Sequence, residues 1–151
     1  IYGQDAYLLP DSIRRCLFGC VEQHFSRIPG TVLEQITLCD PQITGEMAKE
    51  AARLAGIDEA IQTLPEGYDT VCTDGMFSQG ERQLLSIARA AAADPAVLLL
   101  DEITANLDAG TEARVREALR QASRGRTVLS VSHRIYEYLG GRTVEILPQG
   151  Q

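Results

Sequence analysis

Apolar residues recur at three- and four-residue intervals in three segments of the chain, residues 44–56, 78–95 and 111–122. This spacing predicts amphipathic helices that turn one face toward a core. Gly56 is the last residue of the first segment and predicts the end of its helix. The positions expected to face inward are Met47, Ala51, Leu54 and Ala55 in the first, Leu84, Ile87, Ala88 and Ala91 in the second, and Val115, Ala118, Leu119 and Ala122 in the third.

Unbroken apolar runs mark two further segments, residues 96–100 and 126–132. Such runs predict strands that are buried on both faces, as in a parallel sheet. Residues 12–23 read as a short helical turn that runs into a strand, and residues 142–147 as a last strand. Strands that alternate with helices indicate an α/β fold with a largely parallel sheet.

The stretch from residue 30 to residue 76 departs from this alternation, because it contains no convincing strand. Residues 30–38 are expected to start a short helix, Asp40 and Pro41 to break the chain, and residues 64–76 to form a loop. We therefore expect residues 30–76 to be a mostly helical insertion.

Composition limits the class of protein. The 151 residues suit one domain, and 44% of them are hydrophobic, which is enough for a core. The formal net charge is −7, so the chain lacks the basic footprint of a nucleic-acid binder. No apolar run approaches the roughly 20 residues of a membrane span. The chain begins at Ile1 in the middle of a pattern, and we expect it to be a piece of something longer.

The chain has four cysteines, Cys16, Cys20, Cys39 and Cys72. Cys16, Cys20 and His24 are four residues apart and would share one face of a helix, as metal ligands can. The apolar residues 17–21 favour a strand instead, which breaks that geometry. Reduced, buried thiols are therefore the expected state.

Two adjacent carboxylates, Asp101 and Glu102, come directly after the apolar run 96–100. Ligands of open α/β sheets bind beyond the carboxyl ends of the strands. An aspartate there can hold Mg²⁺, and a neighbouring glutamate can orient or deprotonate an attacking water. The alternative is that two acids simply begin a solvated loop.

Two further candidates have structural alternatives. His133 follows the apolar run 126–132 and would lie at the same edge if the strands are parallel and adjacent; there it could contact a γ-phosphate or serve structure alone. Ser78 and Glu81 fit a capping box at the start of a helix. A helix start at which Gly80 gives access to the backbone is also an anion site, and both interpretations can hold together.

Taken in order, these segments resemble the nucleotide-binding domain of ABC transporters. Residues 1–5, IYGQD, look like a strand and turn of that domain. The other matching segments are CVEQHFSRIPGTVLEQI (20–36) with the Q-loop region, FSQGERQLLSIARA (77–90) with the signature LSGGQRQ, VLLLDEITANLD (97–108) with Walker B and the D-loop, and SVSHR (130–134) with the H-loop. The Q-loop region and GYDTVCTDG (67–75) are similar to those of exporters.

The resemblance implies a P-loop NTPase-like fold, a partial parallel sheet flanked by helices. Residues 1–29 and 77–151 would form part of a RecA-like core, and residues 30–76 a mostly helical subdomain. It also implies ATP and Mg²⁺ as cofactors, a membrane domain and a second nucleotide-binding domain as partners, no nucleic acid, and a place at the cytoplasmic face of the membrane.

Site residues follow from the same resemblance. Asp101 would support Mg²⁺, and Gln23 would sense the metal or water and couple to the membrane domain. Glu102 would be the catalytic carboxylate, and His133 would contact the γ-phosphate. The remaining assignments lie at the dimer interface, where Asp108 would close the D-loop and the signature residues Ser78, Gln79, Gly80 and Glu81 would face the ATP of the partner domain.

Two departures from the family pattern qualify these roles. Gln79 replaces a glycine and Glu81 a glutamine of the signature, which predicts a weakened half-site, although Gln79 can point outward and the capping box can occupy Glu81. No G-x-x-x-x-G-K-[ST] motif occurs, so we expect the carboxy-terminal part of the domain, which would be marginally stable and inactive alone and would bind ATP weakly. The alternatives are a non-catalytic regulatory half-domain and, less favoured by the acidic charge, a chromosome-maintenance or translation-factor ATPase.

Overall fold

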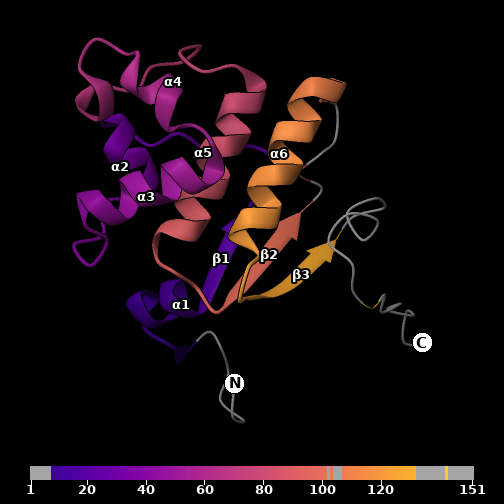
Figure 1. Ribbon diagram of the computed structural model, residues 1–151. Helices are drawn as coiled ribbons and strands as arrows, with labels where there is room; N and C mark the ends of the chain where they lie inside the picture. Colours follow the sequence, from indigo (N-terminus) through magenta and orange to yellow (C-terminus); the bar gives the residue numbers. More distant parts are fainter. Residues whose placement is uncertain (1–7, 102, 104–106, 132–141, 143–151) are drawn as a thin grey trace, which may run out of the picture.

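The computed structural model describes residues 8–101, 103, 107–131 and 142 (Figure 1). The order of its elements is α1 (Asp11–Leu17), β1 (Phe18–Val21), α2 (Val32–Thr37), α3 (Gly45–Ala55), α4 (Asp58–Gln62), the 3₁₀ turn η2 (Gly67–Asp69), α5 (Gln79–Ala92), β2 (Val97–Asp101), α6 (Ala109–Ala122) and β3 (Thr127–Val131). No helix in these described ranges is long and apolar enough to cross a membrane.

The three described strands form a parallel sheet in the order β1-β2-β3. Helix α5 packs against β1 and beside α6, while α2, α3 and α4 form a group on the other side of α5 (Figure 1). This arrangement is a small parallel sheet flanked by helices, as the sequence predicts. Residues 30–76 hold helices and one isolated bridge, Thr31 to Val71, so the mostly helical character of this stretch is confirmed.

The predicted inner faces of two helices are confirmed. Every predicted inner residue of α5 and of α6 is buried. Helix α3 is rotated from the predicted face: Ala51 and Ala55 are buried with Ala48 and Ala52, whereas Met47 and Leu54 are half-buried. An alanine face allows α3 to lie close to α5, and the longer side chains then pack at the border of the contact. Gly56 ends α3 in the left-handed conformation (φ 71°).

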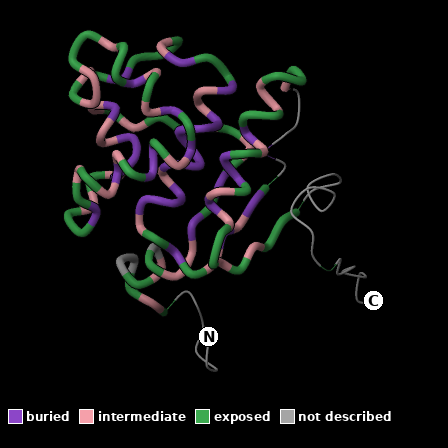
Figure 2. The backbone as a smooth tube through the Cα atoms, viewed as in Figure 1, coloured by how far each residue is buried: buried purple, intermediate pink, exposed green. Residues whose placement is uncertain are grey.

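The strands are where burial departs from the prediction. In β2, Leu98 and Leu100 are buried, but Val97 and Leu99 are only half-buried. Strand β3 was predicted to be buried on both faces, and this was wrong, because Leu129 is 58% exposed and Val131 72% exposed (Figure 2). In the described part of the chain, β3 pairs with β2 alone and therefore lacks the second neighbour that would cover it. The predicted strands at 1–5 and 142–147 fall outside the described residues, except for residue 142.

Gly19 permits a close contact of α5 with β1. It is buried in the middle of β1, where a Cβ atom would collide with the carbonyl oxygen of Ala90 in α5 and would lie 2.8 Å from Cγ of Pro95. The obstructing oxygen belongs to helix backbone, which cannot move aside like a side chain. Strand and helix can therefore be this close only with glycine at the position.

We predict that Gly19→Ala destabilises the fold by about 1–3 kcal/mol, the usual cost of overpacking. Gly45→Ala is the matched control, because a Cβ there meets only Cδ2 of Leu33 at 4.0 Å. Since Gly45 begins α3, the control should be neutral or gain up to about 1 kcal/mol from helix propensity. Urea unfolding measures both, and equal midpoints for the two variants would contradict the close contact.

Candidate functional site

The three parallel strands end at one edge of the sheet. Asp101, the last residue of β2, is exposed there, and Val21, the last residue of β1, pairs with Leu100. Glu22 follows Val21, so in the register of the two strands it stands level with Asp101. Gln23 comes after it and is half-buried. This edge thus collects the side chains that follow β1 and β2, as the position of ligands in open α/β sheets requires.

Two predicted site residues lie outside the described part of the chain, Glu102 and His133. The condition on which the His133 hypothesis depends is confirmed, because β2 and β3 are parallel and adjacent, with Asp101 opposite Val131. The assigned roles of both residues stay predictions.

The carboxylates at this edge are close enough to affect a neighbouring thiol. The pKa of Cys20 in β1 is raised, first by burial and then by the negative charges of Glu22 and Asp101. Glu22 is a candidate site residue that the sequence did not indicate, since nothing in its local pattern separates it from a surface glutamate. Two carboxylates therefore make this edge anionic.

Magnesium fits this edge. Within the described ranges, no three histidine, cysteine or acidic side chains gather to hold a metal. Mg²⁺ is usually bound by one or two carboxylates together with substrate phosphates and water, rather than by a full protein cage. The exposed Asp101 at the end of β2 is a carboxylate of that kind.

The cysteines differ from the prediction in burial. All four are free thiols, but only Cys72 is buried, and Cys16, Cys20 and Cys39 are exposed. Cys16 lies in α1 and Cys20 in β1, since the strand begins at Phe18, so the shared helical face is lost as expected. Burial of the other three was wrongly predicted: Cys16 and Cys39 lie at helix ends, and Cys20 lies in β1 beside an open cavity.

Helix α5 begins with the predicted capping box. The Oγ atom of Ser78 accepts a hydrogen bond from the Glu81 N–H (3.3 Å). The Ser78 N–H and hydroxyl both donate to Oε2 of Glu81, each at 2.8 Å. Gln79 is exposed, so its side chain does point away from the helix. A carboxylate of the chain itself therefore lies at this helix start and accepts both hydrogen bonds that Ser78 can donate.

Gly80 has a packing role that the sequence did not reveal. It is buried, and a Cβ atom there would overlap Cγ2 of Thr111 in α6. The starts of α5 and α6 therefore lie against each other. Asp108 caps α6 through its Oδ1 atom, which accepts from the N–H groups of Gly110 and Thr111, each at 3.0 Å.

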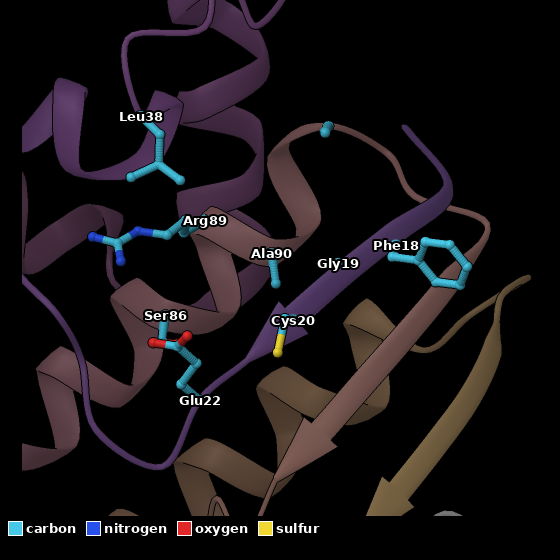
Figure 3. Close-up of a pocket in the computed structure, with 9 residues that line it drawn as sticks. Phe18, Gly19, Cys20, Glu22, Leu38, Ser86, Arg89 and Ala90 are labelled. Carbon is cyan, nitrogen blue, oxygen red and sulfur yellow. The ribbon is translucent and has the colours of Figure 1, made fainter. Parts of the chain in front are cut away.

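A cavity of about 230 Å³ lies between β1 and α5 (Figure 3). Figure 3 shows Cys20 and Phe18 of β1, Ser86 and Arg89 of α5, and Leu38 from the end of α2 around it. Glu22 also lines it, so the cavity reaches the carboxyl edge of the sheet. None of the predicted site residues contributes to its wall. The same helix that carries the capping box therefore borders a hollow beside the strand end.

Comparison with known proteins agrees with this geometry. Residues 5–105 match a family model described as "ABC transporter". The chain is 42% identical over 134 residues (88% of its length) to the mycobactin import ATP-binding/permease protein IrtA of Mycolicibacterium smegmatis. It is 35% identical over its whole length to the probable multidrug resistance ABC transporter ATP-binding/permease protein YheH of Bacillus subtilis. It is 37% identical over its whole length to the uncharacterized ABC transporter ATP-binding protein YfiC of the same organism.

The chain spans only a part of each of these relatives. It covers 16% of the length of IrtA, 23% of YheH and 25% of YfiC. The relatives therefore inform the ATP-binding part, and what the whole protein transports is a separate question.

We predict that Ser78→Ala lowers the free energy of unfolding by about 1 kcal/mol, because the start of α5 loses its cap. Glu81→Gln should retain most of that stability, since an amide oxygen can accept the same two hydrogen bonds. Urea unfolding compares the variants. If Glu81→Gln were as unstable as Ser78→Ala, the negative charge rather than the hydrogen bonds would hold the cap together.

The cap of α6 should make stability depend on pH. The hydroxyl and N–H of Thr111 and the N–H of Gly110 donate to Asp108 and hold its pKa below the ordinary value. A carboxyl with a lowered pKa adds stability above its unfolded pKa of about 3.9, and this is lost as the pH falls through the lower folded value. Asparagine caps equally well without titrating.

We therefore predict that stability falls less between pH 7 and pH 3 in Asp108→Asn than in the unchanged protein. Urea unfolding at the two pH values measures the difference. Identical losses in the two proteins would show that the titration of Asp108 is not linked to folding.

Proposed function

Because this chain belongs to the ABC transporter family, we propose that its sheet edge handles ATP in a transporter that hydrolyses ATP to drive substrate export through a membrane domain. The observation that carries the proposal is the parallel order β1-β2-β3, which brings the residues after β1 and the end of β2 to one edge. The proposed division is a RecA-like core portion (1–29 and 77–151) and a helical subdomain (30–76).

The reaction roles at this edge are proposed as follows. Asp101 and Gln23 hold a Mg²⁺ that comes with ATP, and the metal would neutralise the charge that develops on the phosphates. Glu102 orients the attacking water and accepts its proton, and His133 donates a hydrogen bond to the γ-phosphate. The exposure of Asp101 supports the first role, because a ligand can reach it.

The start of α5 is proposed to face the ATP held by a second ATP-binding domain, through Ser78, Gln79 and Gly80. Asp108, at the adjoining start of α6, would close the same interface. The contact between Gly80 and Thr111 supports this pairing, because it holds the two helix starts side by side. In this structure the Glu81 carboxylate takes up both hydrogen-bond donors of Ser78, so an incoming phosphate must displace it or accept other donors.

Export is proposed because residues 20–36 and 67–75 resemble the corresponding segments of exporters. The printed names of the relatives include an import protein and a multidrug resistance protein, so a transport assay in vesicles must decide the direction. We propose the cytoplasmic face of the membrane as its location, with the membrane domain and the second ATP-binding domain as partners.

The test is Glu102→Gln in the full-length protein. We predict a loss of turnover of about 10²–10⁴-fold, the usual contribution of a general base, with ATP binding unchanged. Glu117→Gln is the matched control, because Glu117 lies on the exposed face of α6 and pairs with Arg120. Turnover is measured as phosphate release and binding by calorimetry. Retained hydrolysis in Glu102→Gln would remove this residue from its proposed role.

A further inference from the structure

We infer that Gln83 is a positioning residue for the ATP-handling edge. Its buried amide holds the backbone beside Gln23 and so sets where the Gln23 side chain stands. This inference rests on the proposed function, in which Gln23 contacts Mg²⁺ or the attacking water. It also gives a functional role to a residue of α5 beyond the first turn of the helix.

The contact that carries the inference joins residues 61 positions apart. Nε2 of Gln83 donates to the backbone carbonyl of Glu22 at 3.2 Å. Gln83 lies on α5 and is only 5% exposed. A buried amide in a helix otherwise lined with apolar residues is costly unless its hydrogen bonds are made, so this side chain has a defined partner and a fixed place. The carbonyl that it holds belongs to the peptide unit whose nitrogen is that of Gln23.

A second side chain of α5 holds the same segment further along. Nη1 of Arg89 donates to the carbonyl of Ser26 at 3.0 Å, and its guanidinium carbon lies 4.3 Å from the centre of the Phe25 ring. Nε of Arg89 also donates to the carbonyl of Gln35 in α2 at 2.7 Å. Gln83 and Arg89 are six residues apart, about 9 Å along the helix. One rigid element therefore fixes the segment from Glu22 to Ser26 at both ends.

The same helix begins at the proposed contact with the partner domain's ATP. Ser78 precedes Gln83 by five residues, about 7.5 Å of helix. Ten of the fourteen residues of α5 are buried, so the helix is packed along its length. Gln83 therefore connects the helix that begins at the proposed partner contact to the backbone beside Gln23.

A purely structural role for Gln83 is the competing explanation, and the chain offers a matched control for it. Gln35 is fully buried, and its side chain donates to the Ile28 carbonyl and accepts from the Ile28 N–H, each at 2.9 Å. Gln35 therefore holds the chain at Ile28, two residues beyond that segment and away from Gln23. Replacing either glutamine by methionine removes a buried amide at similar volume, but only Gln83→Met frees the end beside Gln23.

The first arm of the experiment is hydrogen exchange of the full-length protein without nucleotide. In Gln83→Met, the peptide covering residues 19–25 should exchange about fivefold faster, as expected from the loss of one hydrogen bond. In Gln35→Met, faster exchange should be confined to residues 28–36. Unchanged exchange of residues 19–25 in Gln83→Met overturns the inference.

The second arm is the dependence of ATP hydrolysis on Mg²⁺ concentration. Gln83→Met should raise the half-saturating Mg²⁺ about tenfold and lower kcat while leaving KM for ATP unchanged, because a misplaced Gln23 weakens the metal contact. Gln35→Met should leave the half-saturating Mg²⁺ unchanged, since a general loss of stability lowers only the amount of active protein. Equal Mg²⁺ dependence in the two variants overturns the inference.

A third variant covers the case in which Gln83→Met does not fold. Gln83→Asn keeps a buried amide but is one methylene shorter, so it holds the Glu22 carbonyl less well and should give the same two effects at smaller size. Failure of the proposed function can be told apart from failure of this inference. If the protein without substitutions shows no Mg²⁺-dependent hydrolysis, the proposed function and the catalytic part of this inference are overturned. The exchange arm then still decides whether Gln83 holds the segment.

Discussion

Helix α5 lies directly on strand β1 because Gly19 places no side chain between them, and most of the remaining structure is arranged around this contact. The backbone of α5 therefore lies against the backbone of β1, with no side chain between them. From that position Gln83 and Arg89 reach the chain that leaves the strand, and the opposite side of α5 receives α2 and α3. Helix α5 therefore contacts the sheet, the segment after β1 and the helical group.

The parts of this arrangement that the sequence predicts are those encoded locally. The inner faces of α5 and α6 follow from the 3.6-residue period, and the cap at Ser78 from the spacing of a serine and a glutamate. Helix α4 was missed because it has only five residues and because its N-cap residue, Ile57, makes no capping hydrogen bond from its side chain. Its support comes from Tyr68, whose hydroxyl donates to Asp58 at 2.6 Å, a contact between residues ten apart that no periodicity records.

Features that depend on neighbouring elements, such as the burial of a strand, were predicted less well. An apolar run shows that a strand can be buried, but its burial is decided by what lies on each side, and β3 has one strand beside it in the described part of the chain. The same limit applies at the site. Asp101 is marked by its place after an apolar run, whereas Glu22 matters only through the register of β1 with β2, and Gln83 only through its contact with Glu22. Polar residues within a helical pattern carry no local sign of a partner 61 residues away.

The start of α5 shows how stability and the proposed function compete for the same groups. A helix N-terminus attracts an anion through its free N–H groups and the helix dipole. Glu81 already places a carboxylate there and accepts from both the N–H and the hydroxyl of Ser78, while the N–H groups of Gln79 and Gly80 lie outside this capping box. A phosphate arriving from a partner domain meets a negative charge where the family's signature has a neutral glutamine. It must either use the N–H groups of Gln79 and Gly80 beside the Glu81 carboxylate or exchange the cap's hydrogen bonds for its own. In both cases the gain at this contact is smaller than a helix start without that carboxylate would give.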